Sequence, residues 1–274
     1  MGVLNTTPDS FSDGGRFLDT PAALAHGREL AAQGAQIIDV GGESTRPGAE
    51  PVEAQEELAR TAPVVAALAS AGLARISIDT SKAAVAEVAL REGATIVNDV
   101  TAFRGDPEMA ALVADRGVDC CLMHMLGEPR TMQREPHYED VVEEVKSFLA
   151  ERLEFALAQG IEERRVMLDP GIGFGKTAEH NLELLRRLDE LVSLGPPLVI
   201  GTSRKAFLGR LAPGQPGPQE RLPGTIATNV LAYERGASVF RVHDVAPVRD
   251  ALVVAAATLG RRWTQSSTAT TART

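Results

Sequence analysis

"RISIDTSKAAVAEVALREGATIVNDV", residues 75–100, contains two short runs rich in β-branched residues, separated by a segment with helical periodicity. The first run, 75–80, carries Asp79 near its end, and the second, 95–100, carries Asn98 and Asp99. A strand, a helix and a second strand in this order predict a parallel βαβ unit with polar groups at the strand ends.

The same unit recurs along most of the chain. Runs that read as strands occur at 2–5, 36–40, 75–80, 95–100, 119–125, 165–170, 197–202 and 238–244. Eight strand–helix units in about 260 residues predict an α/β fold, a (β/α)8 TIM barrel that forms a single domain. A doubly wound open sheet is the rival, but it more usually has five or six strands. We expect the barrel to span 1–264 and the low-complexity tail 265–274 to be disordered.

Composition limits the possible functions. The chain has 274 residues, 44% of them hydrophobic and 24% charged, which is typical of soluble globular proteins. It has no apolar run of 18 residues, so we expect no membrane partner, and the net charge of −9 argues against nucleic acid. The first residues do not resemble a signal peptide, which favours a cytoplasmic protein. The neighbouring Cys120 and Cys121 are expected to be buried, reduced thiols.

Polar residues follow every predicted strand. In a barrel, the carboxyl ends of the strands converge on one mouth, where the active site lies. A single aspartate there could simply cap the next helix. Polar side chains at eight ends out of eight instead predict a functional site, built from Asn5, Asp39, Asp79, Asn98, Asp99, His124, Asp169, Ser203 to Lys205, Arg241 and His243.

Two motifs could suggest other functions. "GIGFGKT", residues 171–177, looks like a phosphate-binding loop, but Pro170 stands where a P-loop requires its first glycine. The five histidines show neither the HExxH spacing nor a pairing with the cysteines, which argues against zinc. We expect most of them to be surface or capping residues, with His243 as the exception.

The strand-end motifs together resemble one enzyme family. "NTTPDSFSDGG", "DVGGESTRPG", "SIDT", "VNDV", "MHMLGEPRTMQ", "LDPGIGFGKT", "GTSRKAFLG" and "RVHDV" are similar, in order, to the barrel loops of dihydropteroate synthases. The resemblance covers about residues 2–260. It implies condensation of 6-hydroxymethyl-7,8-dihydropterin diphosphate with 4-aminobenzoate, giving 7,8-dihydropteroate and diphosphate in folate synthesis. It also implies small-molecule substrates, Mg²⁺ as cofactor, and a homodimer formed through the later helices.

The chemistry of the residues fits this implied reaction. A buried carboxylate can accept two N–H groups from the edge of a pterin, and we expect Asp169 to do so. The expected catalytic residues are Lys205, Asp79, Arg241 and His243. Asp79 can accept from a ring nitrogen, and Lys205 can place a cation near the pterin carbonyl. Arg241 and His243, two residues apart on a predicted strand, point to the same face and can neutralise the diphosphate. Mg²⁺ tolerates few protein ligands, so the amide oxygen of Asn5 can hold it together with phosphate and water. The other expected substrate contacts are Asn98, the apolar walls Val100, Met123 and Phe174, and Gly201.

No nucleophile is required, because loss of diphosphate leaves a cation delocalised over the dihydropterin, and positioning with electrostatics can suffice. That cation must be kept from water until the amine adds. We therefore expect two loops to close as lids over the benzoate, the first with Asp9, Ser10, Phe11 and Ser12, the second with Ser44, Thr45, Arg46 and Pro47.

The chain departs from the family pattern at Thr6, commonly Val, and at Ala206, commonly Ser, where a hydroxyl near the benzoate carboxylate is lost. Many members also have residues before the first strand, so the true start can lie upstream. Three alternatives remain open: a pterin-binding barrel of the methyltetrahydrofolate methyltransferase kind, a non-catalytic pterin-binding paralogue, and a Schiff-base aldolase using Lys205.

Overall fold

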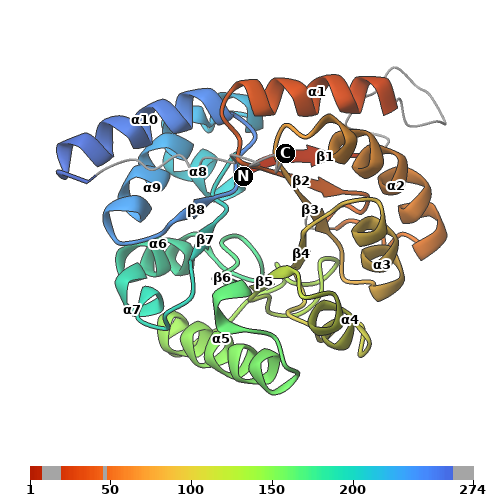
Figure 1. Cartoon of the computed structure of the whole chain (residues 1–274). Helices are drawn as coiled ribbons and strands as arrows, with labels where there is room; N and C mark the ends of the chain where they lie inside the picture. The colour runs from red at the N-terminus through yellow and green to blue at the C-terminus, as the bar shows by residue number, and fades with distance from the viewer. Residues whose placement is uncertain (8–19, 46–47, 262–274) are drawn as a thin grey trace.

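The computed structural model describes residues 1–7, 20–45 and 48–261, and its centre is a ring of parallel strands (Figure 1). The strands are β1 (Gly2–Asn5), β2 (Ile37–Gly41), β3 (Arg75–Asp79), β4 (Ile96–Asp99), β5 (Asp119–Met123), β6 (Val166–Asp169), β7 (Val199–Ile200) and β8 (Val239–Phe240). The first six pair in sequence order, and β7 pairs with β8. Isolated parallel bridges join Leu168 to Leu198 and Gly2 to Val242, and so close the ring. The predicted (β/α)8 barrel is confirmed, and the open sheet does not fit.

Helices cover the outside of the ring (Figure 1). In the described ranges, each of the first five crossovers contains one α-helix, β6–β7 and β7–β8 contain two each, and the last helix follows β8. The helices are α1 (Thr20–Ala32), α2 (Ala54–Ala71), α3 (Ala83–Arg91), α4 (Met109–Arg116), α5 (Val141–Ala158), α6 (Ala178–Arg186), α7 (Leu188–Val192), α8 (Ala206–Leu211), α9 (Leu222–Glu234) and α10 (Val245–Thr258). Within the described ranges, none of them combines the length and the apolar character needed to cross a bilayer.

The helix ends show local sequence signals at work. Asp140 caps α5 by accepting from the backbone N–H groups of Val142 and Glu143. Thr177 and His180 form a reciprocal capping box at the start of α6, so His180 is a capping residue as expected. Gly72 ends α2 in the left-handed region, at φ 61°, where a side chain would be strained.

The core has two layers. Side chains between strands and helices form the larger one, and a small cluster of Ile96, Cys121, Met167 and Val199 fills the barrel interior. Cys120 faces the outer layer, because successive strand residues point to opposite faces. Both cysteines are free and buried, as predicted.

The last two strands are shorter than predicted. β8 ends at Phe240, so Arg241 and His243 lie beyond it and not on a regular strand. The backbone changes partner there, because Arg241 N–H donates to Ile200 O while Val242 N–H donates to Met1 O. The position of these two side chains is therefore set by closure of the barrel onto β1, which the strand pattern alone did not reveal.

Candidate active site in the barrel mouth

Strand register aligns several candidate residues. Asn5 pairs in register with Gly41, Gly41 with Asp79, and Asp79 with Asn98, so the ends of β1 to β4 form one row. The hydroxyl of Thr6 joins this row by donating to Gly41 O at 3.0 Å. Asn5, Asp79 and Asn98 thus lie at one level of the mouth, whereas Asp39 lies two residues before the end of β2, in register with Val3 and Ser77.

Arg241 lies at the centre of the charged groups. Its Nε donates to Asp39 Oδ2 and its Nη2 to Asp79 Oδ2, both at 2.7 Å. Asn98 Nδ2 donates to the same oxygen of Asp39 at 3.1 Å. Burial lowers the pKa of Arg241, but Asp39 and Asp79 outweigh burial and raise the pKa above its usual value. The guanidinium is a permanent cation between two buried acids.

The carboxyl of Asp79 differs from an ordinary aspartate. Burial raises its pKa to about 7, the Arg241 cation opposes that rise, and the nearby charges of Asp39, Glu57 and Asp99 reinforce it. Asp39, predicted at a strand end, is the middle residue of β2 and is not among the expected substrate contacts. It is fully buried, and its Oδ1 has no hydrogen-bond partner among the described residues. An unpaired buried carboxylate oxygen is a place for a ligand N–H group.

Asp169 closes the opposite side of the mouth at the end of β6. Its Oδ1 accepts from Gly171 N–H at 2.7 Å within the tight turn that follows the strand. Burial raises the pKa of Asp169, against the opposing effects of the Gly171 N–H and the cations Lys205, Arg241 and Lys176. The carboxyl is buried, fixed on one oxygen, and surrounded by positive charge.

The three predicted apolar walls lie together. Val100, Met123 and Phe174 form one cluster separate from the main core, with Met125 and Met132 as further members. Lys205 Nζ lies 4.1 Å from the centroid of the Phe174 ring, in a cation–π arrangement. Met125 and Met132 were not among the predicted residues, although the quoted "MHMLGEPRTMQ" motif contains both.

The loops after β7 and β8 are tied to each other. His243 Nδ1 lies 3.0 Å from Ser203 Oγ, and Arg204 binds Asp244 through two hydrogen bonds of 3.0 and 2.6 Å. Arg204 has φ 60°, a left-handed conformation that is rare for a side chain of this size. The ion pair holds this turn, and Gly201 and Lys205 on either side of it, next to the loop that carries His243.

The second predicted lid is anchored to the barrel at its base. Lys82, before α3, binds Glu43 of the β2–α2 loop and, at 2.6 Å, the fully buried Glu57 of α2. Thr45 follows this anchor and is half-buried. The other lid predictions lie outside the described residues: Asp9, Ser10, Phe11, Ser12, Arg46 and Pro47.

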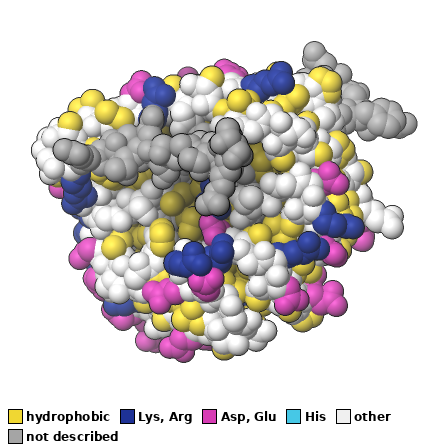
Figure 2. Space-filling view, in the orientation of Figure 1, with side chains coloured by type: hydrophobic (Ala, Val, Ile, Leu, Met, Phe, Trp, Pro, Cys, Tyr) yellow, Lys and Arg dark blue, Asp and Glu magenta, His cyan; other side chains and the backbone are white. Residues whose placement is uncertain are grey.

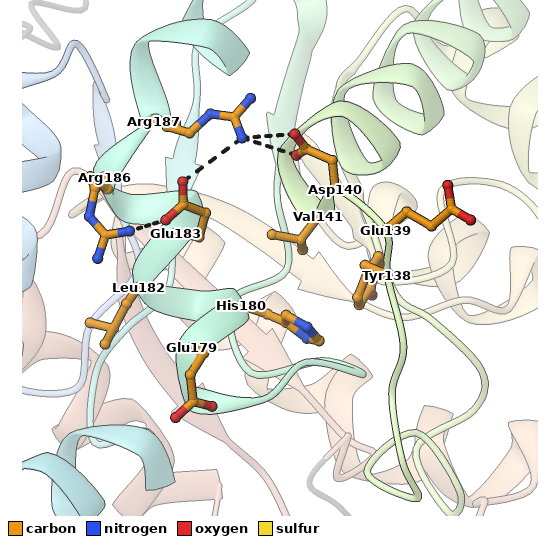
Figure 3. A pocket seen from close by; sticks show the side chains of 10 residues that line it. All are labelled: Tyr138, Glu139, Asp140, Val141, Glu179, His180, Leu182, Glu183, Arg186 and Arg187. Atoms are coloured by element: carbon orange, nitrogen blue, oxygen red, sulfur yellow. Dashed lines mark hydrogen bonds and ion pairs between the residues drawn. The ribbon is translucent and has the colours of Figure 1, made fainter.

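A pocket of about 490 Å³ opens elsewhere, between the first turns of α5 and α6 (Figure 3). Its charged side chains are engaged with one another, since Arg187 reaches across to Asp140 and Arg186 pairs with Glu183. None of the candidate residues lines it. The mouth, and not this pocket, contains the convergent groups that chemistry needs.

His124 directly follows β5, where the strand-end pattern predicted a polar group of the site. It is 6% exposed, so it is neither a surface nor a capping residue. Its Nδ1 lies 2.8 Å from Nζ of Lys176, which is itself 3% exposed. The sequence analysis gave no role to Lys176, although the quoted "LDPGIGFGKT" motif contains it.

Known proteins resemble this chain over most of its length. Residues 1–243 match the family described as pterin binding enzyme. The dihydropteroate synthase of Synechocystis is 48% identical over 89% of this chain and 84% of its own length. The Xanthomonas albilineans dihydropteroate synthase structure with 4-aminobenzoic acid has a TM-score of 0.89 and 46% identity, covering 96% of this chain and 93% of that one. The same enzyme in complex with 7,8-dihydropteroate has a TM-score of 0.86 and 44% identity, covering 96% and 94%.

Proposed function

We infer that this chain, which belongs to the pterin-binding enzyme family, is a dihydropteroate synthase. It condenses 6-hydroxymethyl-7,8-dihydropterin diphosphate with 4-aminobenzoate in folate biosynthesis, releasing diphosphate. The observation that supports this most directly is the joint placement in one mouth of the Asp39–Arg241–Asp79 network and the Val100–Met123–Phe174 cluster. A flat ring with polar edges fits between such groups.

The pterin occupies this space. Asp169 accepts two N–H groups from its amino-pyrimidinone edge, and Asn98 offers both a donor and an acceptor to the same ring. Asp79 accepts from another ring nitrogen. The Val100, Met123 and Phe174 side chains cover its faces, and Lys205, held over Phe174, places a cation near the pterin carbonyl.

The reaction breaks the CH2–O bond, and the electron pair leaves with the diphosphate. The positive charge on the dihydropterin is stabilised by the buried acids around it, while Arg241 and His243, with the Gly201 turn beside them, face the diphosphate. The aniline nitrogen then bonds to the carbon and loses a proton. The protein contributes position, charge and exclusion of water.

The mouth offers few protein ligands for Mg²⁺. The described residues contain no group of three or more His, Cys, Asp or Glu that could hold a metal ion. Asn5, level with Asp79 and Asn98 in the strand register, supplies one amide oxygen. Mg²⁺ accepts such sparse protein ligation when phosphate oxygens and water complete its shell. When bound, it neutralises charge on the diphosphate.

The benzoate site consists of Thr45, Arg46 and Pro47 from the second loop and Asp9, Ser10 and Phe11 from the first. The anchoring of Glu43 by Lys82 supports this assignment, because it fixes the base of the second loop at the mouth. The enzyme works as one domain, 1–264, in the cytoplasm, and the tail 265–274 takes no part.

Two copies of the chain associate through α9 and α10. These helices pack against each other and expose Leu231, Val253, Val254 and Leu259, of which Val254 is 65% exposed. Hydrophobic side chains are visible at the upper left, and others are scattered among charged side chains over the rest of the visible face (Figure 2). An apolar patch of this kind is typical of a subunit interface.

One assay tests the proposed function. The chain is incubated with the pterin diphosphate and Mg²⁺, with and without 4-aminobenzoate, and both diphosphate and dihydropteroate are measured. With 4-aminobenzoate present, we expect the two products in equal amounts. Without it, we expect no appreciable release of diphosphate. Binding of the pterin without any dihydropteroate formed would identify a non-catalytic paralogue, and methyl transfer from a methylated folate would identify the methyltransferase kind.

A further inference from the structure

Lys176 is a buried lysine for which the proposed reaction has no use. Its Nζ donates to Gly171 O and Phe174 O, each at 3.0 Å, and bonds to His124 Nδ1 at 2.8 Å. Two of these partners belong to the β6–α6 loop and the third to the end of β5. One ammonium group therefore links two neighbouring loops of the mouth.

Nζ of Lys176 has three hydrogen-bond partners, one of them the ring of His124. Burial, followed by the nearby Lys176 and Arg104 cations, lowers the pKa of His124 to about 2, so its ring is neutral and Nδ1 accepts. Burial lowers the pKa of Lys176 to about 7, with Asp169 opposing and Lys205 reinforcing that shift. Arg104 stacks on Phe148, whose ring contacts His124 edge-on. Several side chains therefore fix the ring of His124, and with it the position of Lys176 Nζ.

The loop that Lys176 holds is built for close approach. Gly171, Gly173 and Gly175 all have positive φ, and a Cβ at Gly171 would lie 1.8 Å from His124 O. Side chains from outside bind the remaining backbone groups, since Gln133 donates to Gly173 O and Tyr138 to Gly175 O. Glycine residues adopt many backbone conformations, so these hydrogen bonds determine the conformation of the loop.

We propose that Lys176 is a positioning residue for the pterin pocket, because its ammonium group fixes the backbone on both sides of the ring-binding side chains. Phe174 is held through its own carbonyl. Asp169 is held indirectly, through Gly171. The N–H of Gly171 donates to the Asp169 carboxylate, and its carbonyl accepts from Lys176. This inference rests on the proposed function, which assigns Phe174 and Asp169 to the pterin.

The test compares Lys176→Met, which keeps the length and apolar stem but removes all donors, with the wild-type chain. We expect at least a tenfold weaker affinity for 6-hydroxymethylpterin in calorimetry and a matching rise in KM for the pterin diphosphate. The value of kcat should change less than threefold. Lys146→Met on α5 is the matched control and should leave all three values unchanged. In Phe174→Ala, the further effect of Lys176→Met should be much smaller, because the two residues act on the same contact.

A merely structural role predicts a different result. It would lower Tm and leave the pterin affinity of the folded protein within twofold of wild type, and that outcome would overturn the proposal. If Lys176→Met does not fold, Lys176→Gln retains a shorter donor, and the same criterion applies to it with an expected loss of at least threefold. Failure of the wild-type chain to bind the pterin would instead count against the proposed function.

Discussion

Arg241 illustrates how single residues set the character of this site. Two carboxylates on different strands share its guanidinium, at 2.7 Å each. Burial raises the pKa of Asp79, and the Arg241 cation opposes that rise. The guanidinium therefore favours the charged form of Asp79, at the place where we propose that the dihydropterin becomes positive.

Asp169→Asn tests the pterin contact at the residue scale. The substitution keeps the shape of the side chain, but it places an amide N–H group where the N–H groups of the pterin need an acceptor. We expect pterin binding to weaken by about 3 kcal/mol, roughly a hundredfold. Isothermal calorimetry measures this, with the exposed Asp250→Asn as control. An unchanged affinity would remove Asp169 from the pocket.

Asp79 gives the stability of the protein a pH dependence. Its folded-state pKa is raised to about 7 from 3.8, mainly by burial, so the folded state holds this proton more tightly than the unfolded state. The resulting stabilisation is complete below about pH 4 and is lost as the pH rises through 7.

Asp79→Asn removes this titration. Relative to wild type, the free energy of unfolding of the variant should therefore rise between pH 5 and pH 8, by up to a few kcal/mol at ~1.4 kcal/mol per pKa unit. Urea titrations at both pH values measure the difference. A difference that stays constant with pH would contradict the raised pKa.

At the scale of elements, the β2–α2 loop shows how a fixed base can carry a functional segment. Lys82 joins Glu43 of that loop to Glu57 of α2. Burial lowers the pKa of Lys82, but its hydrogen bonds with Glu43 and Glu57 outweigh burial and raise the pKa. Glu57 is fully buried and one of its oxygens lacks a partner among the described residues, so it depends on Lys82 for charge compensation.

Lys82→Met leaves the Glu57 charge buried without its cation. We expect a loss of about 3 kcal/mol of unfolding free energy, the cost of breaking a buried pair from one side. Lys82→Met combined with Glu57→Gln should recover part of that loss, since the unpaired charge is gone. Guanidinium unfolding of the three proteins measures both effects, and a double variant no more stable than Lys82→Met would show that charge is not the cause.

The two predicted lid loops lead to an order of binding. A benzoate has too few heavy atoms to offset the ordering of two polar loops, at ~1–2 kcal/mol per residue. We expect 4-aminobenzoate to bind tightly only after diphosphate and Mg²⁺. Phe11→Ala and Pro47→Ala should raise its KM and leave pterin binding nearly intact. Titration of 4-aminobenzoate with and without diphosphate and Mg²⁺ tests this order of binding. Equal affinities under the two conditions would mean that the pocket is preformed.

At the scale of the whole molecule, closure of the ring determines what the mouth can contain. The bridge from Gly2 to Val242 brings the last strand beside the first, and with it Arg241 beside Asp39, which lies 202 positions away in the chain. On the outside of the barrel, α9 and α10 expose the apolar side chains that we propose a second copy of the chain covers.

Val254→Glu tests the homodimer that we propose. A charge placed in an apolar interface must be desolvated on association, so we expect a dimer dissociation constant at least about a hundredfold higher. Leu73→Glu, at a site 48% exposed beyond the end of α2, should leave the dimer unchanged. Sedimentation equilibrium measures both, and a wild-type chain that is monomeric at all concentrations would refute the interface.

The sequence by itself determined the eight strand–helix units and the presence of polar groups at every strand end, because periodicity and strand-end composition are local properties of the chain. It also indicated Val100, Met123 and Phe174 as the apolar walls of the site. Only the tertiary structure decided that Asp39 shares Arg241 with Asp79, that Arg241 and His243 leave the strand, and that Lys176 reaches His124. Those contacts join residues from different units, and their geometry exists only once the barrel has closed and water has been excluded from its mouth.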